Sequence, residues 1–140
     1  MSDLIILIAE DDDGHALLIK ETIEESGISN QLIRFKDGKE LWDFFTGESM
    51  DSLYDPSQRY LVLLDINMPR MGGLEVLRKL KSEKEFRKIP VMMLTTTDDP
   101  REVENCYQMG CSVYITKPID FNRFISTLKR LGLFIEIIEV

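Results

Sequence analysis

The feature that most constrains the fold is an unbroken apolar run, Leu61–Leu64, that ends at a carboxylate, Asp65. Four aliphatic residues in succession are typical of a strand buried on both faces, as central strands of parallel sheets are. Residues 66–73 then contain Pro and Gly, which indicates a loop. Because ligands of open α/β sheets bind at the carboxyl ends of the strands, Asp65 is predicted to lie at the reactive edge.

Strand and helix patterns alternate five times along the chain. The predicted strands are residues 4–9, 31–36, 61–65, 91–94 and 112–116, and the predicted helices are residues 14–26, the region around 41–45, 73–83, 100–110 and 121–131. This alternation predicts an α/β fold, a doubly wound five-stranded parallel sheet with helices on both faces. Right-handed crossovers favour the strand order 2-1-3-4-5.

The composition predicts one domain and excludes several functions. A chain of 140 residues that is 44% hydrophobic suits a single domain over residues 1–140. Its net charge of -8 argues against binding to nucleic acid or anionic membranes, and its apolar runs are shorter than the ~20 residues that span a bilayer. The first residues lack the basic region of a secretion signal, and Cys106 and Cys111 suit neither a disulfide framework nor a zinc site. A cytoplasmic location is therefore expected.

Polar side chains follow four of the predicted strands at one edge of the sheet. They are Glu10 and Asp11, Asp65, Thr95, and Lys117. Each one alone is typical of a helix cap, a turn or a solvated side chain. Their convergence on one edge predicts a site instead.

The acidic members of this group predict a metal site. Three carboxylates at one place repel each other unless a cation neutralises them, and a donor set of oxygens alone suits Mg²⁺. Asp11 and Asp65 are the predicted direct ligands, with Glu10 acting through a water. The backbone carbonyl of Asn67 is a further predicted ligand.

The same residues predict phosphoryl chemistry. Asp65 would be the nucleophile and would form an acyl phosphate. The Lys117 ammonium, together with Mg²⁺, would offset charge on the transferring group, and the Thr95 hydroxyl would hydrogen-bond a phosphoryl oxygen.

Four stretches carry a resemblance to a known family, and they are residues 8–12, 63–73, 90–95 and 117–118. In this order and register they resemble the response-regulator receiver domain of two-component signalling, which has a flavodoxin-like fold, over Leu4 to about Leu131. The resemblance implies that a partner histidine kinase or histidine phosphotransfer protein donates a phosphoryl group to Asp65. It implies no enzymatic activity other than this self-directed transfer and the later hydrolysis of the acyl phosphate.

The family's conformational switch also maps onto the chain. By resemblance, Thr95 moves toward the phosphoryl group and Tyr114 moves inward behind it. This would change the face made by the fourth helix, the fifth strand and the fifth helix. Asn67 and Thr96 stand where the family tunes the lifetime of the phosphoryl group, and Thr96 is bulkier than the small residue often found there.

The carboxyl-terminal residues 132–140 form an apolar extension. Leu128, Leu131, Ile135 and Ile138 would share a stripe if the last helix continued, whereas an added strand would alternate. The extension is either an extra turn of core helix or a dimer contact, and the face around the fifth strand is the other candidate for a homodimer. No output domain is expected. The long connection over residues 47–59 and the apolar tail are similar to phytochrome-associated response regulators.

Two other functions compete with a signalling switch. Haloacid-dehalogenase-type phosphatases also use a strand-end Asp, a Thr and a Lys with Mg²⁺, but they need a general acid two residues after the nucleophile, where this chain has Asn67. A docking module that is never phosphorylated is the third reading, and the presence of the whole acid, Asp, Thr and Lys set argues against it. His15 is expected to be a surface residue near the start of the first helix.

Overall fold

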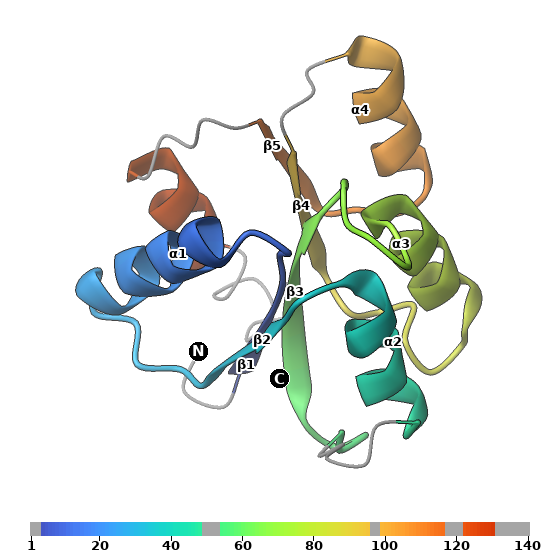
Figure 1. The fold of residues 1–140 in the computed structure, drawn as a ribbon, viewed down its shortest axis with the longest axis horizontal. Coiled ribbons are helices and arrows are strands. Elements are labelled where there is room, and N and C mark those ends of the chain that lie inside the picture. The colour runs from blue at the N-terminus through green and yellow to red at the C-terminus, as the bar shows by residue number, and fades with distance from the viewer. Residues whose placement is uncertain (1–3, 49–53, 96–98, 117–121, 131–140) are drawn as a thin grey trace.

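The computed structural model describes residues 4–48, 54–95, 99–116 and 122–130 (Figure 1). Its elements in chain order are β1 (Leu4–Ala9), α1 (Asp13–Glu25), β2 (Leu32–Phe35), α2 (Gly38–Thr46), β3 (Arg59–Asp65), α3 (Gly73–Ser82), β4 (Val91–Thr95), α4 (Pro100–Gln108), β5 (Val113–Thr116) and a further helix over residues 122–130. The strands form one parallel sheet in the order β2-β1-β3-β4-β5. The predicted class, strand order and helix positions are confirmed.

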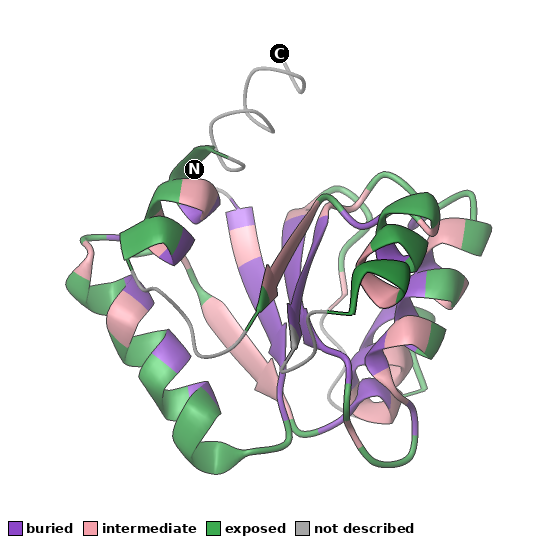
Figure 2. Ribbon diagram, turned by 90° about the horizontal axis from the view of Figure 1, so that it is seen from above, coloured by how far each residue is buried: buried purple, intermediate pink, exposed green. Residues whose placement is uncertain are grey.

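The sheet is covered on both faces. In Figure 2, α1 and the helix over residues 122–130 lie on one side of the sheet, and α2, α3 and α4 lie on the other. Alternate residues of β3 pack into different cores: Leu61 and Leu63 join the core beneath α1, whereas Val62 and Leu64 join the core beneath α2 and α3. All four are fully buried, which explains why the strand is apolar without interruption.

The end of α4 shows how one glycine moved a predicted boundary. The helix ends at Gln108 rather than at Gly110, because Gly110 has a φ of 106°, a left-handed conformation that stops a right-handed helix. The N–H of Gly110 donates to the carbonyl of Tyr107, and the N–H of Cys111 donates to the carbonyl of Cys106. These two bonds form a Schellman motif that satisfies the last carbonyls of the helix.

An aromatic cluster packs around Tyr54, in the described part of the connection before β3. Its members are Phe44 and Phe45 of α2, Tyr54, Tyr60 and Phe86. The hydroxyl of Tyr60 accepts the N–H of Asp55 at 3.0 Å, and the hydroxyl of Tyr54 donates to Glu85 at 3.2 Å. Burial, followed by the Glu85 contact, raises the pKa of Tyr54 to about 12. Tyr60 stands near the start of β3, so this cluster anchors the edge of the sheet opposite to Asp65.

No helix in the described parts of the chain combines the length and the apolar character that crossing a bilayer requires.

The start of α3 yields a first prediction. A Cβ at Gly73 would lie 2.2 Å from the backbone oxygen of Asp65, whereas a Cβ at Gly72 would lie 3.3 Å from the oxygen of Ile66. Gly73→Ala is expected to lower the free energy of unfolding by about 1–3 kcal/mol, because backbone must move to admit the methyl group. Gly72→Ala should lower the free energy of unfolding clearly less than Gly73→Ala does. Urea unfolding of both variants checks this, and equal losses would contradict it.

Candidate metal and phosphoacceptor site

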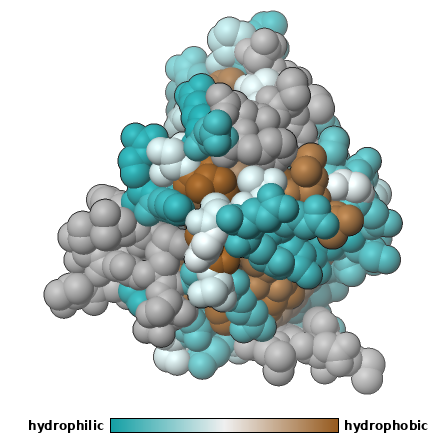
Figure 3. Space-filling model, turned by 90° about the vertical axis from the view of Figure 1, so that its left-hand side faces the viewer, coloured by the Kyte–Doolittle hydropathy of each residue, from teal (hydrophilic) through white to brown (hydrophobic). Residues whose placement is uncertain are grey.

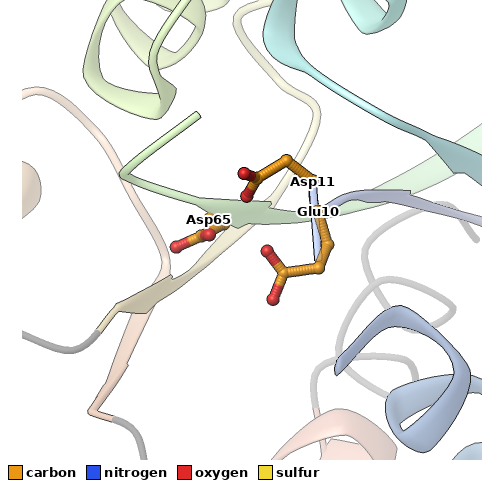
Figure 4. Close-up of side chains that lie close together, drawn as sticks. All are labelled: Glu10, Asp11 and Asp65. Atoms are coloured by element: carbon orange, nitrogen blue, oxygen red, sulfur yellow. The ribbon is translucent and has the colours of Figure 1, made fainter. Parts of the chain in front are cut away.

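Three carboxylates meet at the carboxyl edge of the sheet. Glu10 and Asp11 follow β1, and Asp65 is the last residue of the neighbouring strand β3. One carboxylate oxygen from each lies within 4.8 Å of the others, and Figure 4 shows the side chains of Glu10 and Asp11 extending toward Asp65. Glu10 and Asp65 are buried, with 1% and 7% of their surface exposed, whereas Asp11 is exposed. The group is therefore open to solvent on the side of Asp11.

Backbone pairing sets this geometry. Ala9 pairs with Leu64, which brings the residues that follow each strand side by side. Beyond Asp65 the N–H of Ile66 still donates to the carbonyl of Leu94, at 3.3 Å. The N–H of Gly73 then donates to the carbonyl of Ile66 at 2.8 Å and folds the loop over residues 66–73 back onto the end of β3.

The structure describes some of the other predicted site residues and not the rest. Thr95 ends β4 and pairs with Thr116 at the end of β5, so its backbone lies at the predicted edge. The Thr95 side chain, Thr96, Lys117 and the extension over residues 132–140 lie outside what the structure describes, and their roles stay predictions. Asn67 is exposed in the loop after Asp65. That its backbone carbonyl binds the metal also stays a prediction.

Tyr114, the predicted switch aromatic, lies in the middle of β5. Its side chain is half-buried and packs against the core beneath α2 and α3. Its backbone N–H donates to the hydroxyl of Tyr107 at 3.2 Å, which links β5 to α4. Its inward movement stays a prediction.

An ion pair that the sequence did not reveal holds the loop after Asp65. Arg70, at a φ of 64°, donates from Nε to Oδ2 of Asp37 at 2.8 Å and from Nη2 to Oδ1 at 3.3 Å. Asp37 also caps α2 by accepting the N–H of Glu40 at 2.9 Å. A Cβ at Gly38 would lie 2.1 Å from the carbonyl oxygen of Met71, so the loop and the start of α2 touch through their backbones.

The ion pair changes the acidity of Asp37. Burial alone would raise the pKa of this carboxyl, but hydrogen bonds from Arg70 and from the N–H of Glu40, with the charge of Arg70, more than offset it. The pKa is therefore lowered, and Asp37 stays ionised at neutral pH. Asp37 and Arg70 are 33 positions apart, and the sequence signal at Asp37-Gly38 indicated only a turn.

Two residues around Glu10 complete the surroundings of the site. His15 is exposed at the start of α1, as predicted, and its Nδ1 lies 3.4 Å from Oε1 of Glu10. Arg34 of β2 was not singled out from the sequence, and its guanidinium contacts the carbonyl of Glu10. The one feature of the sequence that could have pointed to Arg34 is its charge, because the other residues of the strand Leu32–Phe35 are apolar.

Comparison with known proteins decides the family. A family model described as the response regulator receiver domain matches residues 6–129. The chain belongs to the response regulator receiver family. It is thus a receiver domain of two-component signalling, as the sequence resemblance predicted.

Individual relatives agree with this assignment. The polar-differentiation response regulator DivK of Brucella ovis is 36% identical over 124 residues, which cover 89% of this chain and 92% of that protein. A crystal structure of a response regulator receiver domain from Rhodospirillum rubrum is 40% identical with a TM-score of 0.79, covering 95% of this chain and 94% of that one. The bacteriophytochrome response regulator RtBRR is 31% identical with a TM-score of 0.78, covering 94% of this chain and 79% of that one. Phytochrome-associated receivers are therefore among its structural neighbours.

The acidic group of this receiver domain fits a hard divalent cation. All three donors are oxygens, and none of them is a thiolate or an imidazole that would favour a softer ion. Two of the carboxylates are buried and the third is exposed, so water can reach the group from one side. Mg²⁺ usually keeps several waters when few carboxylates bind it.

The lowered pKa of Asp37 yields a second prediction. A carboxyl with a lowered folded-state pKa contributes stability that is present above the unfolded-state pKa of about 3.9 and is lost as the pH falls through the folded-state value. Arg70→Gln is therefore expected to lower the free energy of unfolding at pH 7, and its difference from wild type should narrow below about pH 4. Urea unfolding across this range measures it.

Arg101→Gln is the matched control, because Arg101 and its partner Asp99 are both largely exposed, at a distance of 3.8 Å. This variant should stay close to wild type at every pH. A loss in Arg70→Gln that does not change with pH would contradict the assigned role of Asp37.

Proposed function

We propose that this receiver domain accepts a phosphoryl group on Asp65, with Mg²⁺ bound beside it, from a phosphohistidine of a partner histidine kinase or phosphotransfer protein. The observation that carries the proposal is the meeting of Glu10, Asp11 and Asp65, two of them buried, at the end of adjacent strands. Buried like charges are costly unless a cation joins them, so the group is suited to a metal-assisted reaction.

The chain's own residues would divide the work as follows. Asp11 and Asp65 would bind Mg²⁺ directly, the backbone carbonyl of Asn67 would add a ligand, and Glu10 would act through a water. The bound Mg²⁺ would neutralise charge on the transferring group. A carboxylate oxygen of Asp65 bonds to phosphorus as the phosphorus–nitrogen bond of the phosphohistidine breaks. The other ring nitrogen of that phosphohistidine carries a proton, so the imidazole leaves as a neutral ring with the electron pair of the broken bond. Lys117 offsets the charge on the phosphoryl oxygens.

The switch would follow from the new phosphoryl group. The Thr95 hydroxyl donates to a phosphoryl oxygen, and Tyr114 moves inward behind it. This alters the face that α4, β5 and the helix over residues 122–130 present to partners. Asn67 and Thr96 set the lifetime of the acyl phosphate through water access to it.

The phosphodonor protein would dock on α1. This helix begins at Asp13, two residues after Asp11, and it exposes two large apolar side chains, Leu17 at 55% and Leu18 at 45%. Figure 3 shows this side of the molecule, where apolar patches lie among hydrophilic side chains. Exposed leucines beside the acidic site suit a protein partner better than a small substrate.

The wider biology follows from the same proposal. The chain would act in the cytoplasm as a single receiver domain over residues 1–140 and would signal through protein contacts rather than through nucleic acid or membranes. Cys106 and Cys111 are buried free thiols, which suits a reducing compartment. The face around β5 or the extension over residues 132–140 would serve as a homodimer contact.

Phosphorylation by a small donor tests the proposal. With Mg²⁺ and acetyl phosphate, we expect one phosphate per chain, labile to hydroxylamine and absent from Asp65→Asn, measured by intact-protein mass spectrometry. Asp43→Asn is the control, because Asp43 pairs with Lys39 on α2 and does not belong to the acidic group. Retention of the phosphate in Asp65→Asn would refute the assignment. Sustained Mg²⁺-dependent hydrolysis of phosphomonoesters, lost in Asp65→Asn, would instead favour a phosphatase.

The role given to Lys117 can be separated from folding. Lys117→Ala is expected to keep the thermal unfolding temperature of the wild type while losing most of the phosphorylation-dependent shifts of the amide resonances in β5 and α4. Lys88→Ala, an exposed lysine outside the site, should behave as wild type. A grossly destabilised Lys117→Ala would mean that this lysine is structural.

A further inference from the structure

We propose that Arg34 is a positioning residue for the metal and phosphoacceptor site, acting through the peptide that joins Glu10 to Asp11. The inference deepens the proposed function and rests on it. Arg34 lies on the neighbouring strand β2 and is part of neither the acidic group nor the loop that carries it.

The guanidinium of Arg34 grips one backbone oxygen with two donors. Nε donates to the carbonyl oxygen of Glu10 at 2.9 Å, and Nη2 donates to the same oxygen at 2.7 Å. The remaining terminal nitrogen, Nη1, donates to Oδ1 of Asp13 at 2.8 Å. The Arg34 side chain is only 27% exposed, so water competes little for these bonds.

This oxygen belongs to the peptide between two of the three acidic residues of the predicted metal site. A peptide unit is planar, so fixing its oxygen fixes the ψ of Glu10 and the φ of Asp11 together. On the other side, the N–H of Glu10 donates to the carbonyl of Phe35 at 3.1 Å. The β2 strand thus holds Glu10 at both its amide and its carbonyl, and these contacts set the directions in which the side chains of Glu10 and Asp11 leave the backbone.

The chemistry of arginine suits this task. Its planar fork presents several donors in fixed geometry and always carries charge, and a charged donor makes a hydrogen bond roughly twice as strong as a neutral one. A lysine offers a point charge without the fork. The contact with Asp13 contributes little by comparison, because the Asp13 side chain is 84% exposed.

Titration with Mg²⁺ measures the effect directly. Isothermal calorimetry of the full chain should show Arg34→Gln binding Mg²⁺ about 10–100-fold more weakly than wild type, the loss typical when a group that orients a ligand is removed. Arg34→Lys should recover part of that affinity. Asp13→Asn should bind Mg²⁺ as wild type does, because it leaves both bonds to the Glu10 carbonyl in place.

A variant of the same strand separates positioning from general loss of stability. Ile33→Ala removes a half-buried side chain that packs against the core and leaves both hydrogen bonds from Arg34 to the Glu10 carbonyl in place. It should lower the stability to urea in EDTA yet keep wild-type Mg²⁺ affinity. Equal weakening of Mg²⁺ binding in Ile33→Ala and Arg34→Gln would overturn the positioning role.

The proposed function and this inference fail in different ways. If the wild-type chain neither binds Mg²⁺ nor is labelled at Asp65 by acetyl phosphate, the proposed function fails. If the wild type does both and Arg34→Gln matches its Mg²⁺ affinity, the function stands and the positioning role of Arg34 is refuted.

Discussion

The register between β1 and β3 is the constraint on which the rest of this structure depends. Because Ala9 pairs with Leu64, the first residues beyond β1 lie next to Asp65 at the end of β3. A slip of one residue would turn every side chain of the strand to the other face. The two cores prevent such a slip, since alternate residues of β3 are fitted to different helices on the two sides of the sheet. The packing of the interior therefore fixes where three carboxylates meet.

Holding three acids together also requires the loops around them to be rigid. One arginine acts on each loop: Arg34 grips the peptide after β1, and Arg70 ties the loop after β3 to Asp37. Arg34 and Asp37 flank the end of β2, so this edge strand is the support for both loops. Side chains that bind a metal or a phosphoryl group act best when their surroundings hold them in place beforehand. In this receiver domain the two loops are held by the guanidinium groups of Arg34 and Arg70, which are not part of the acidic group.

The two edges of the sheet have different tasks. At the amino edge, the aromatic cluster around Tyr60 closes the core and ties down the connection that leads into β3. At the carboxyl edge, polar groups replace aromatic ones, and the exposed carboxylate of Asp11 faces solvent. The aromatic cluster thus lies at one end of the strands and the acidic group at the other. The receiver domain from Rhodospirillum rubrum shares this fold over 94% of its chain.

The sequence by itself determined the element types, the parallel sheet, its strand order and the meeting of Glu10, Asp11 and Asp65. These follow from local patterns, because an apolar run that ends at an acid reports both the strand and the edge at which the acid lies. Only the tertiary structure decided that Arg34 holds the Glu10 carbonyl and that Arg70 binds Asp37, since these partners are 24 and 33 positions apart in the chain. It also showed that α4 ends at Gln108, two residues before the glycine that the sequence marked as its stop. Periodicity reports which face a residue occupies, but the partner of a charged side chain depends on how distant segments are brought together in space.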